Sequence, residues 1–256
     1  MKKIPNLFTL LNLIFGCCAI VFALQTESIT IIQGDDQSTS FSVPERLYLA
    51  AICIAIAGLI DFLDGFLARL LNASGEMGRQ LDSLSDVVSF GVAPSFILFQ
   101  FLRFSYMRQA NGIDINILWL MPAFLFACAG AYRLARFNID TTQTYNFKGV
   151  PIPAAGMLVA SLPLIAFYNY FGGAVNAVIF NKWFLYILIL VLSWLMVSTL
   201  PVMGLKFRDY TLQNNIPKLA LLIISIIAAV LFKWMAVPII FVAYIILSLA
   251  LKNKTT

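Results

Sequence analysis

The sequence contains no histidine, so it lacks the side chain that most often moves protons near neutral pH. Any proton transfer must therefore use a carboxylate, a lysine, a tyrosine or water. A metal site built without imidazole nitrogens would depend on oxygen ligands, which suit hard cations such as Mg²⁺, Mn²⁺ or Ca²⁺. The absence of histidine excludes imidazole-based catalysis and histidine-ligated metal centres.

Cysteine is also scarce, and its four positions do not form a ligand pattern. Cys17, Cys18, Cys53 and Cys128 all lie in apolar stretches. This placement argues against a disulfide framework and against a zinc cluster. We interpret the four cysteines as small core residues.

Charged residues make up only 11% of the sequence, whereas hydrophobic residues make up 61%, and the mean hydropathy is +0.90. A soluble domain averages roughly 25% charged and about 45–50% apolar residues. The apolar runs have the length of bilayer-spanning helices, and the alternating strands of a membrane barrel are not visible. The sequence therefore predicts an all-α, polytopic transmembrane helical bundle, with residues 1–256 forming a single membrane-embedded domain.

Hydropathy predicts about eight membrane spans, and the last two would form a hairpin at 218–250 peripheral to the core. The first span follows two lysines, as in a signal peptide, but its length and the lack of a small-residue cleavage site favour a retained helix. The predicted spans are 7–24, 46–71, 83–103, 118–137, 152–170, 183–202, 218–232 and 235–250.

The net charge of +5 is best explained by membrane orientation and contact with anionic lipid, and we expect no nucleic-acid partner. Lysine and arginine concentrate in alternate loops, which predicts a cytoplasmic N-terminus in the cytoplasmic membrane. The acidic segment 25–45 would then lie outside. The acid-rich segment 61–86 would lie at the cytoplasmic end of the second and third spans.

Four aspartates in that segment occur as two pairs with helical spacing. Asp61 and Asp64 are three residues apart, Asp82 and Asp86 are four apart, and each pair shares a helix face. A turn between the pairs would bring them together, and four neighbouring carboxylates would repel one another unless cations lay among them. Solvated acids at a helix end are the alternative, but charges within a span are costly and usually functional. We therefore expect a two-metal site that clamps a phosphate.

Small residues accompany the aspartates. Gly65 and Ala68 follow on the same helix, and Gly75 and Gly78 are expected in the turn. Small side chains let a helix or a phosphate approach the backbone closely. Arg69 can pair with a phosphate oxygen.

The whole pattern resembles a family motif. Asp61-x-x-Asp64-Gly65-x-x-Ala68-Arg69, eight residues, then Gly78-x-x-x-Asp82-x-x-x-Asp86 is similar to the motif of the CDP-alcohol phosphatidyltransferases. These membrane enzymes move a phosphatidyl or similar group from a CDP-linked donor to an alcohol. Further segments resemble the phosphatidylserine synthase branch of the family: 4–13, 81–95, 133–138 and 147–156.

The resemblance implies CDP-diacylglycerol and L-serine as substrates, two Mg²⁺ or Mn²⁺ ions as cofactors, and a homodimer. It implies that Asp61, Asp64, Asp82 and Asp86 hold the ions and that Asp86 also accepts the proton of the serine hydroxyl. The CDP-diacylglycerol site would comprise Asn6, Thr9, Asp61, Gly65, Ala68, Arg69, Ser74, Gly75 and Gly78.

Serine carries a carboxylate, so its pocket should offer a cation. Arg133, Arg136 and Lys148 lie on the same predicted side as the aspartates, and Asn138 could bind the amino group. Alternatively, the three cations only set topology or anchor lipid phosphates.

Three other functions stay open at this point. A sister enzyme would use glycerol 3-phosphate or inositol phosphate as acceptor. An intramembrane prenyltransferase could use the Asp82–Asp86 pair, but would need a second acid-rich motif on a later helix. A cation transporter would need polar groups spread through the bilayer depth, often in paired repeats.

Overall fold

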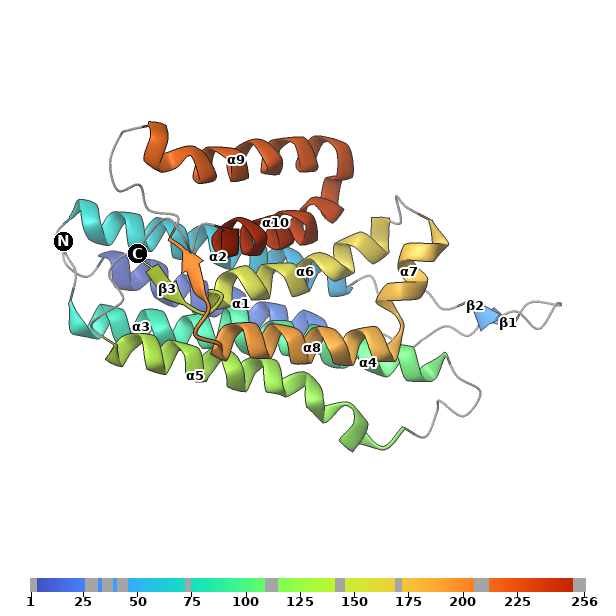
Figure 1. Cartoon of the computed structure of the whole chain (residues 1–256). Helices are drawn as coiled ribbons and strands as arrows, with labels where there is room; N and C mark the ends of the chain where they lie inside the picture. Colours follow the sequence, from blue (N-terminus) through green and yellow to red (C-terminus); the bar gives the residue numbers. More distant parts are fainter. Residues whose placement is uncertain are drawn as a thin grey trace.

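The computed structural model describes residues 4–25, 32–33, 39–40, 46–71, 75–108, 115–140, 146–168, 172–204 and 212–250. These residues form a helical bundle, which confirms the predicted fold class (Figure 1). The helices are α1 (Ile4–Leu24), α2 (Arg46–Leu70), α3 (Glu76–Asp86), η1 (Val87–Val92), α4 (Ala93–Met107), η2 (Ile117–Trp119), η3 (Met121–Phe124), α5 (Leu125–Ile139), α6 (Ile152–Tyr168), α7 (Gly173–Ile179), α8 (Lys182–Val197), α9 (Leu212–Phe232), η4 (Lys233–Met235) and α10 (Ala236–Ala250).

Two small antiparallel sheets of two strands each complete the described fold. β1 (Ile32–Gln33) pairs with β2 (Thr39–Ser40), and β3 (Asn146–Lys148) pairs with β4 (Pro201–Met203). The β1–β2 hairpin lies at the end of the bundle opposite to both termini (Figure 1). The β1–β2 hairpin is therefore remote from the end of α2 and the start of α3.

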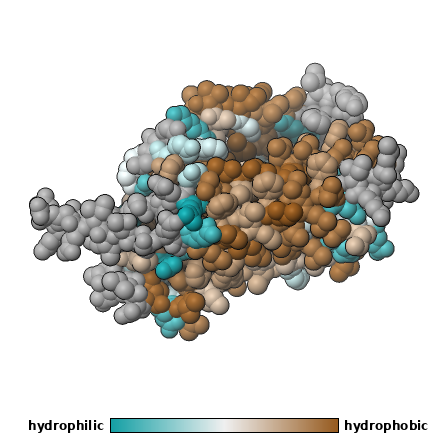
Figure 2. Space-filling model, turned by 180° about the vertical axis from the view of Figure 1, so that it is seen from behind, coloured by the Kyte–Doolittle hydropathy of each residue, from teal (hydrophilic) through white to brown (hydrophobic). Residues whose placement is uncertain are grey.

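Several described helices are apolar enough to cross a membrane, and they indicate an integral membrane protein. By length and composition five helices qualify, and a sixth qualifies if α7 and α8, bent by 61°, count as one span. The predicted number of eight is approximate, because α6 has only 17 residues and 216–250 forms one apolar stretch that turns at Lys233. Figure 2 shows hydrophobic residues over most of one face, with hydrophilic residues toward its two ends.

The predicted start of the third span was wrong by several residues. Helix α3 begins at Glu76, not near residue 83, so Gly78 lies within the helix and not in the turn. The segment 76–82 is polar on most sides, so a search for apolar runs excludes it. It is helical because it continues a span beyond the apolar region.

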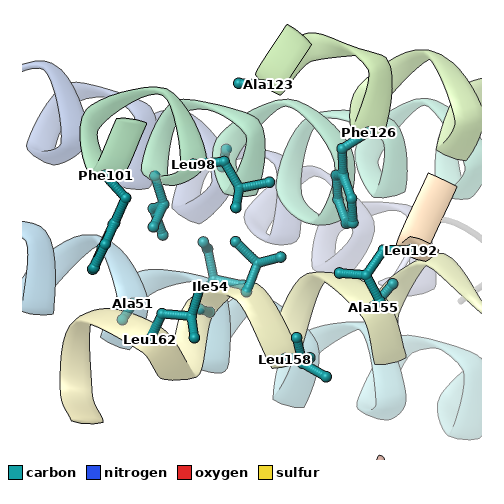
Figure 3. Packing of buried hydrophobic residues seen from close by; sticks show 14 of the residues in the cluster. Ala51, Ile54, Leu98, Phe101, Ala123, Phe126, Ala155, Leu158, Leu162 and Leu192 are labelled. Carbon is teal, nitrogen blue, oxygen red and sulfur yellow. The ribbon is translucent and has the colours of Figure 1, made fainter. Parts of the chain in front are cut away.

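The core lies where α2, α4 and α6 meet. Figure 3 shows Ile54 of α2, Leu98 of α4 and Leu162 of α6 pointing toward one another. Phe90, Phe101 and Phe126 are among the largest fully buried side chains. This interior fixes the helices that carry the polar groups described below.

The chain from Glu76 to Met107 forms one helical span. Its middle part, η1, directly follows Asp86 and has π-helical hydrogen bonding. Pro94 has no N–H to donate to the carbonyl of Phe90, which favours a local change of hydrogen-bond register. Gly156 of α6 packs on this segment, because a Cβ there would lie 2.8 Å from the carbonyl oxygen of Phe90. Irregular turns of this kind often occur at functional sites.

The C-terminal helices differ in how they join the bundle. Helix α9 stands apart and lies alongside α10 (Figure 1). Helix α10 contributes Phe241 to the main core, and its Tyr244 hydroxyl donates to the carbonyl of Met203 at 3.0 Å. The last helix is thereby tied to β4.

Candidate functional site

Three of the predicted carboxylates meet between the end of α2 and α3. Single carboxylate oxygens of Asp61, Asp64 and Asp82 all lie within 4.8 Å of one another. Asp64 is only 5% exposed, whereas Asp61 and Asp82 are half-buried. The helical spacing and the short distance in sequence between the end of α2 and the start of α3 bring these groups together, as the sequence indicated.

Helix α1 supplies polar side chains to the same place. The Thr9 hydroxyl donates to Oδ2 of Asp64 at 2.7 Å and also lies 3.1 Å from the carbonyl oxygen of Pro5. Asn6 lies against Gly78, since a Cβ there would be 3.2 Å from the Asn6 Oδ1. Both α1 residues named from the sequence are therefore at the cluster.

Asp86 adjoins the three-carboxylate group next to Asp61. It is 7% exposed, and its Oδ1 accepts a long hydrogen bond of 3.4 Å from Nδ2 of Asn12. Asn12 was not among the site residues predicted from the sequence. Its three-residue step after Asn6 and Thr9, on an otherwise apolar helix, is the signal that could have revealed it.

Hydroxyl groups hold α1 in register with α3 and η1. Ser85 donates to the carbonyl of Thr9 and Ser89 donates to the carbonyl of Asn12, each at 3.1 Å. Gly16 allows this approach, because a Cβ at that position would clash with Ser89. These contacts fix the height of α1 side chains relative to the carboxylates.

The residues predicted to meet a phosphate border open space. A Cβ on Gly65 would meet no heavy atom within 4 Å of the described residues. Arg69 is exposed, and its Nε donates to the carbonyl of Gly65 at 2.8 Å. Ala68 is half-buried and Gly75 is exposed. Ser74 lies outside the described residues.

Arg133 is the buried cation of the site. It is 6% exposed, and its Nε has no hydrogen-bond partner among the described residues. Asp86, Arg136 and Tyr244 of α10 are titratable neighbours of its guanidinium group. A buried guanidinium with unused donors is costly, and an anionic ligand would satisfy it.

The other predicted acceptor residues already have partners in the protein. Arg136 donates to the carbonyls of Val197 at 2.7 Å, Ser198 at 2.9 Å and Lys148 at 3.3 Å, and so ties the end of α8 to β3. The Lys148 ammonium forms an ion pair with Asp140 at 2.9 Å.

Asn138 is oriented by a neighbour on α3. Its Nδ2 donates to the Ser83 hydroxyl at 2.8 Å, which places its Oδ1 as the remaining acceptor of the amide. Since α3 also carries Asp82 and Asp86, this bond links α5 to the helix of the carboxylates.

The donor set of the cluster fits a hard divalent cation. Every ligand is a carboxylate oxygen, and three of them are close enough to share one ion. Nitrogen and sulfur ligands, which would favour zinc or copper, do not belong to this group.

Comparison with known proteins matches residues 2–195 to a family described as CDP-alcohol phosphatidyltransferase. A Helicobacter pylori protein named CDP-diacylglycerol–serine O-phosphatidyltransferase is 35% identical over 164 residues, which are 63% of this chain and 57% of that protein. Proteins of the same name are 32% identical in Bacillus subtilis, over 63% of this chain and 76% of theirs, and 30% identical in Mycobacterium bovis, over 95% and 76%. The match thus spans little more than half of the H. pylori protein.

Proposed function

Since the chain belongs to the CDP-alcohol phosphatidyltransferase family, we propose that it transfers the phosphatidyl group of CDP-diacylglycerol to the hydroxyl group of L-serine. The products are phosphatidylserine and CMP. The grouping of the Asp61, Asp64 and Asp82 oxygens carries this proposal, because the family motif runs through these residues. Three relatives named for serine as acceptor support the choice of alcohol.

Asp61, Asp64 and Asp82 would hold Mg²⁺ or Mn²⁺, and Asp86, which borders the same space, would be a ligand for a second ion. Bound divalent ions would neutralise the diphosphate and stabilise negative charge on the departing CMP. The Thr9 hydroxyl orients the Asp64 carboxylate, which leaves the other Asp64 oxygen for the ion.

Asp86 accepts the proton of the serine hydroxyl. The serine oxygen then forms a bond to the phosphorus that carries diacylglycerol, and the bond from that phosphorus to the CMP oxygen breaks. With no histidine in the chain, a carboxylate is the natural base. The burial of Asp86 and its place beside the three-carboxylate group suit this role.

The donor lipid lies over the small residues of α2. Gly65 leaves room for a phosphate against the helix backbone, and Ala68 adds little bulk one turn on. Arg69 is held near its own helix by Gly65 and presents its remaining N–H groups to the phosphate. Asn6 of α1, which lies against Gly78 of α3, borders the nucleotide.

Arg133 binds the serine carboxylate, and Asn138 accepts a hydrogen bond from the serine ammonium. The burial of Arg133 and its free Nε support the first contact, and the bond from the Asn138 Nδ2 to Ser83, which leaves Oδ1 as the acceptor of the amide, supports the second. Arg136 and Lys148 then serve mainly to hold the pocket, because they bind carbonyl and carboxylate oxygens of the chain.

The active site faces the cytoplasm from the cytoplasmic membrane, with the N-terminus on the same side. The start of α1 lies at the same end of the bundle as the end of α2 and the start of α3, which is consistent with this orientation (Figure 1). The family commonly forms homodimers, and we infer the same assembly here. Membership in the family disfavours the prenyltransferase and transporter alternatives.

An acceptor comparison tests the proposed function. Purified protein in mixed micelles with CDP-diacylglycerol and Mn²⁺ should release CMP and incorporate labelled serine into lipid. Glycerol 3-phosphate and inositol phosphate should give less than about 1% of that rate, because a site built for one polar acceptor discriminates strongly against others. Faster CMP release with either phosphorylated acceptor would assign the chain to a sister activity.

A further inference from the structure

Asn12 is a buried amide whose hydrogen bonding is incomplete. It is 0% exposed, its Nδ2 faces Asp86 at 3.4 Å, and its Oδ1 has no partner among the described residues. A half-satisfied amide in a membrane helix costs stability, and an apolar side chain of the same size would avoid that cost. Residues that break the rules of good packing in this way are expected at functional sites.

The neighbouring turn of α1 shows the same arrangement at the other pair of aspartates. Thr9 donates to Asp64 of the first pair, and Asn12 donates to Asp86 of the second. The two donors are three residues apart and share one face of α1. The hydroxyls of Ser85 and Ser89 donate to the carbonyls of these same two residues. These bonds fix the position of α1 along α3 and η1.

We propose that Asn12 is a positioning residue that orients the Asp86 carboxylate toward the acceptor hydroxyl, while Thr9 orients Asp64 for the metal. This division of labour rests on the proposed function. It follows from the two hydrogen bonds, because Thr9 donates to Asp64 and Asn12 donates to Asp86. An amide that donates to one oxygen of a carboxylate fixes the direction of the other oxygen.

The test compares two near-isosteric variants, Asn12→Leu and Thr9→Val. Asn12→Leu should lower kcat about 10- to 100-fold, with little change in the KM for CDP-diacylglycerol and with a smaller loss of Mn²⁺ affinity than Thr9→Val, measured by calorimetry without substrate. Thr9→Val should weaken Mn²⁺ binding about tenfold. Asn12→Asp, which cannot donate when ionised, should not restore kcat.

Gln100→Leu is the matched control for lost packing. Gln100 of α4 is also a buried amide, 2% exposed, whose Nε2 donates to the Ala23 carbonyl of α1 and whose Oε1 lacks a partner among the described residues. The contact between Gln100 and Ala23 is far along α1 from Thr9 and Asn12, which contact the carboxylates. Gln100→Leu should therefore have the wild-type kcat, whether or not its Tm changes.

Two outcomes would overturn the role of Asn12. One is an Asn12→Leu protein with wild-type kcat per folded molecule. The other is a loss of Mn²⁺ affinity in Asn12→Leu that equals the loss in Thr9→Val. If the wild type releases CMP with another acceptor and not with serine, the proposed function fails, and the same comparison is made with that acceptor.

Discussion

Asp86→Asn is expected to lower kcat about 10³-fold, the size of effect typical of a lost general base. Asparagine has nearly the same shape but cannot accept the hydroxyl proton. Asp86 lies outside the three-carboxylate group, so Mn²⁺ affinity should change less than in a variant of Asp64 or Asp82. The measurement is incorporation of labelled serine at saturating CDP-diacylglycerol, together with a substrate-free Mn²⁺ titration.

Glu76→Gln provides the matched control for this prediction. The substitution removes the same type of charge from the same helix. Glu76, however, is exposed in the first turn of α3, and its carboxylate pairs with Arg79 at the long distance of 3.9 Å. Its kcat should stay within about twofold of the wild type, since exposed ion pairs contribute little. Substantial serine incorporation by Asp86→Asn would remove Asp86 as the base.

Arg133→Met is expected to raise the KM for serine about ten- to a hundredfold while leaving Tm unchanged or higher. Hydrogen bonds to charged groups contribute about 1.5–3 kcal/mol, and each 1.4 kcal/mol is a factor of ten in affinity. The stability result has a separate cause. Arg133 is buried with an unpartnered Nε, and replacing such a group by an apolar side chain of similar volume relieves its desolvation cost.

Arg103→Met controls for the loss of one arginine, because Arg103 is exposed on α4. It should leave the KM for serine unchanged. Arg133→Lys should give an intermediate KM, because lysine keeps the charge but not the planar fork of donors. A fall in Tm with an unchanged KM in Arg133→Met would instead identify Arg133 as a purely structural residue.

Much of the fold was predictable because a bilayer imposes a simple rule on sequence. Long apolar runs must become helices, and the acid spacing on α2 and α3 sets which side chains share a face. The grouping of Asp61, Asp64 and Asp82 followed from that spacing and from the short turn between the helices. Thr9 was assigned to the CDP-diacylglycerol site through the family resemblance, and in the structure its hydroxyl donates to Asp64.

The remaining features depend on contacts between distant parts of the chain. The amphipathic start of α3 at Glu76 contains no apolar run. The π-helical segment depends on Pro94 together with the close approach of Gly156 to Phe90, which lie on different helices. The sequence could not separate Arg133 from Arg136, because only the folded chain shows which guanidinium meets backbone carbonyls.

The central claim is that the grouped carboxylates on α2 and α3 bind a divalent ion. Mn²⁺ binding to purified, chelator-treated protein, followed by electron paramagnetic resonance without substrate, tests it most directly. The wild type should bind Mn²⁺, and Asp82→Asn should bind at least about tenfold more weakly, because affinity depends on the number of charged ligands. Equal binding by the two proteins, or no binding by the wild type, would contradict the account.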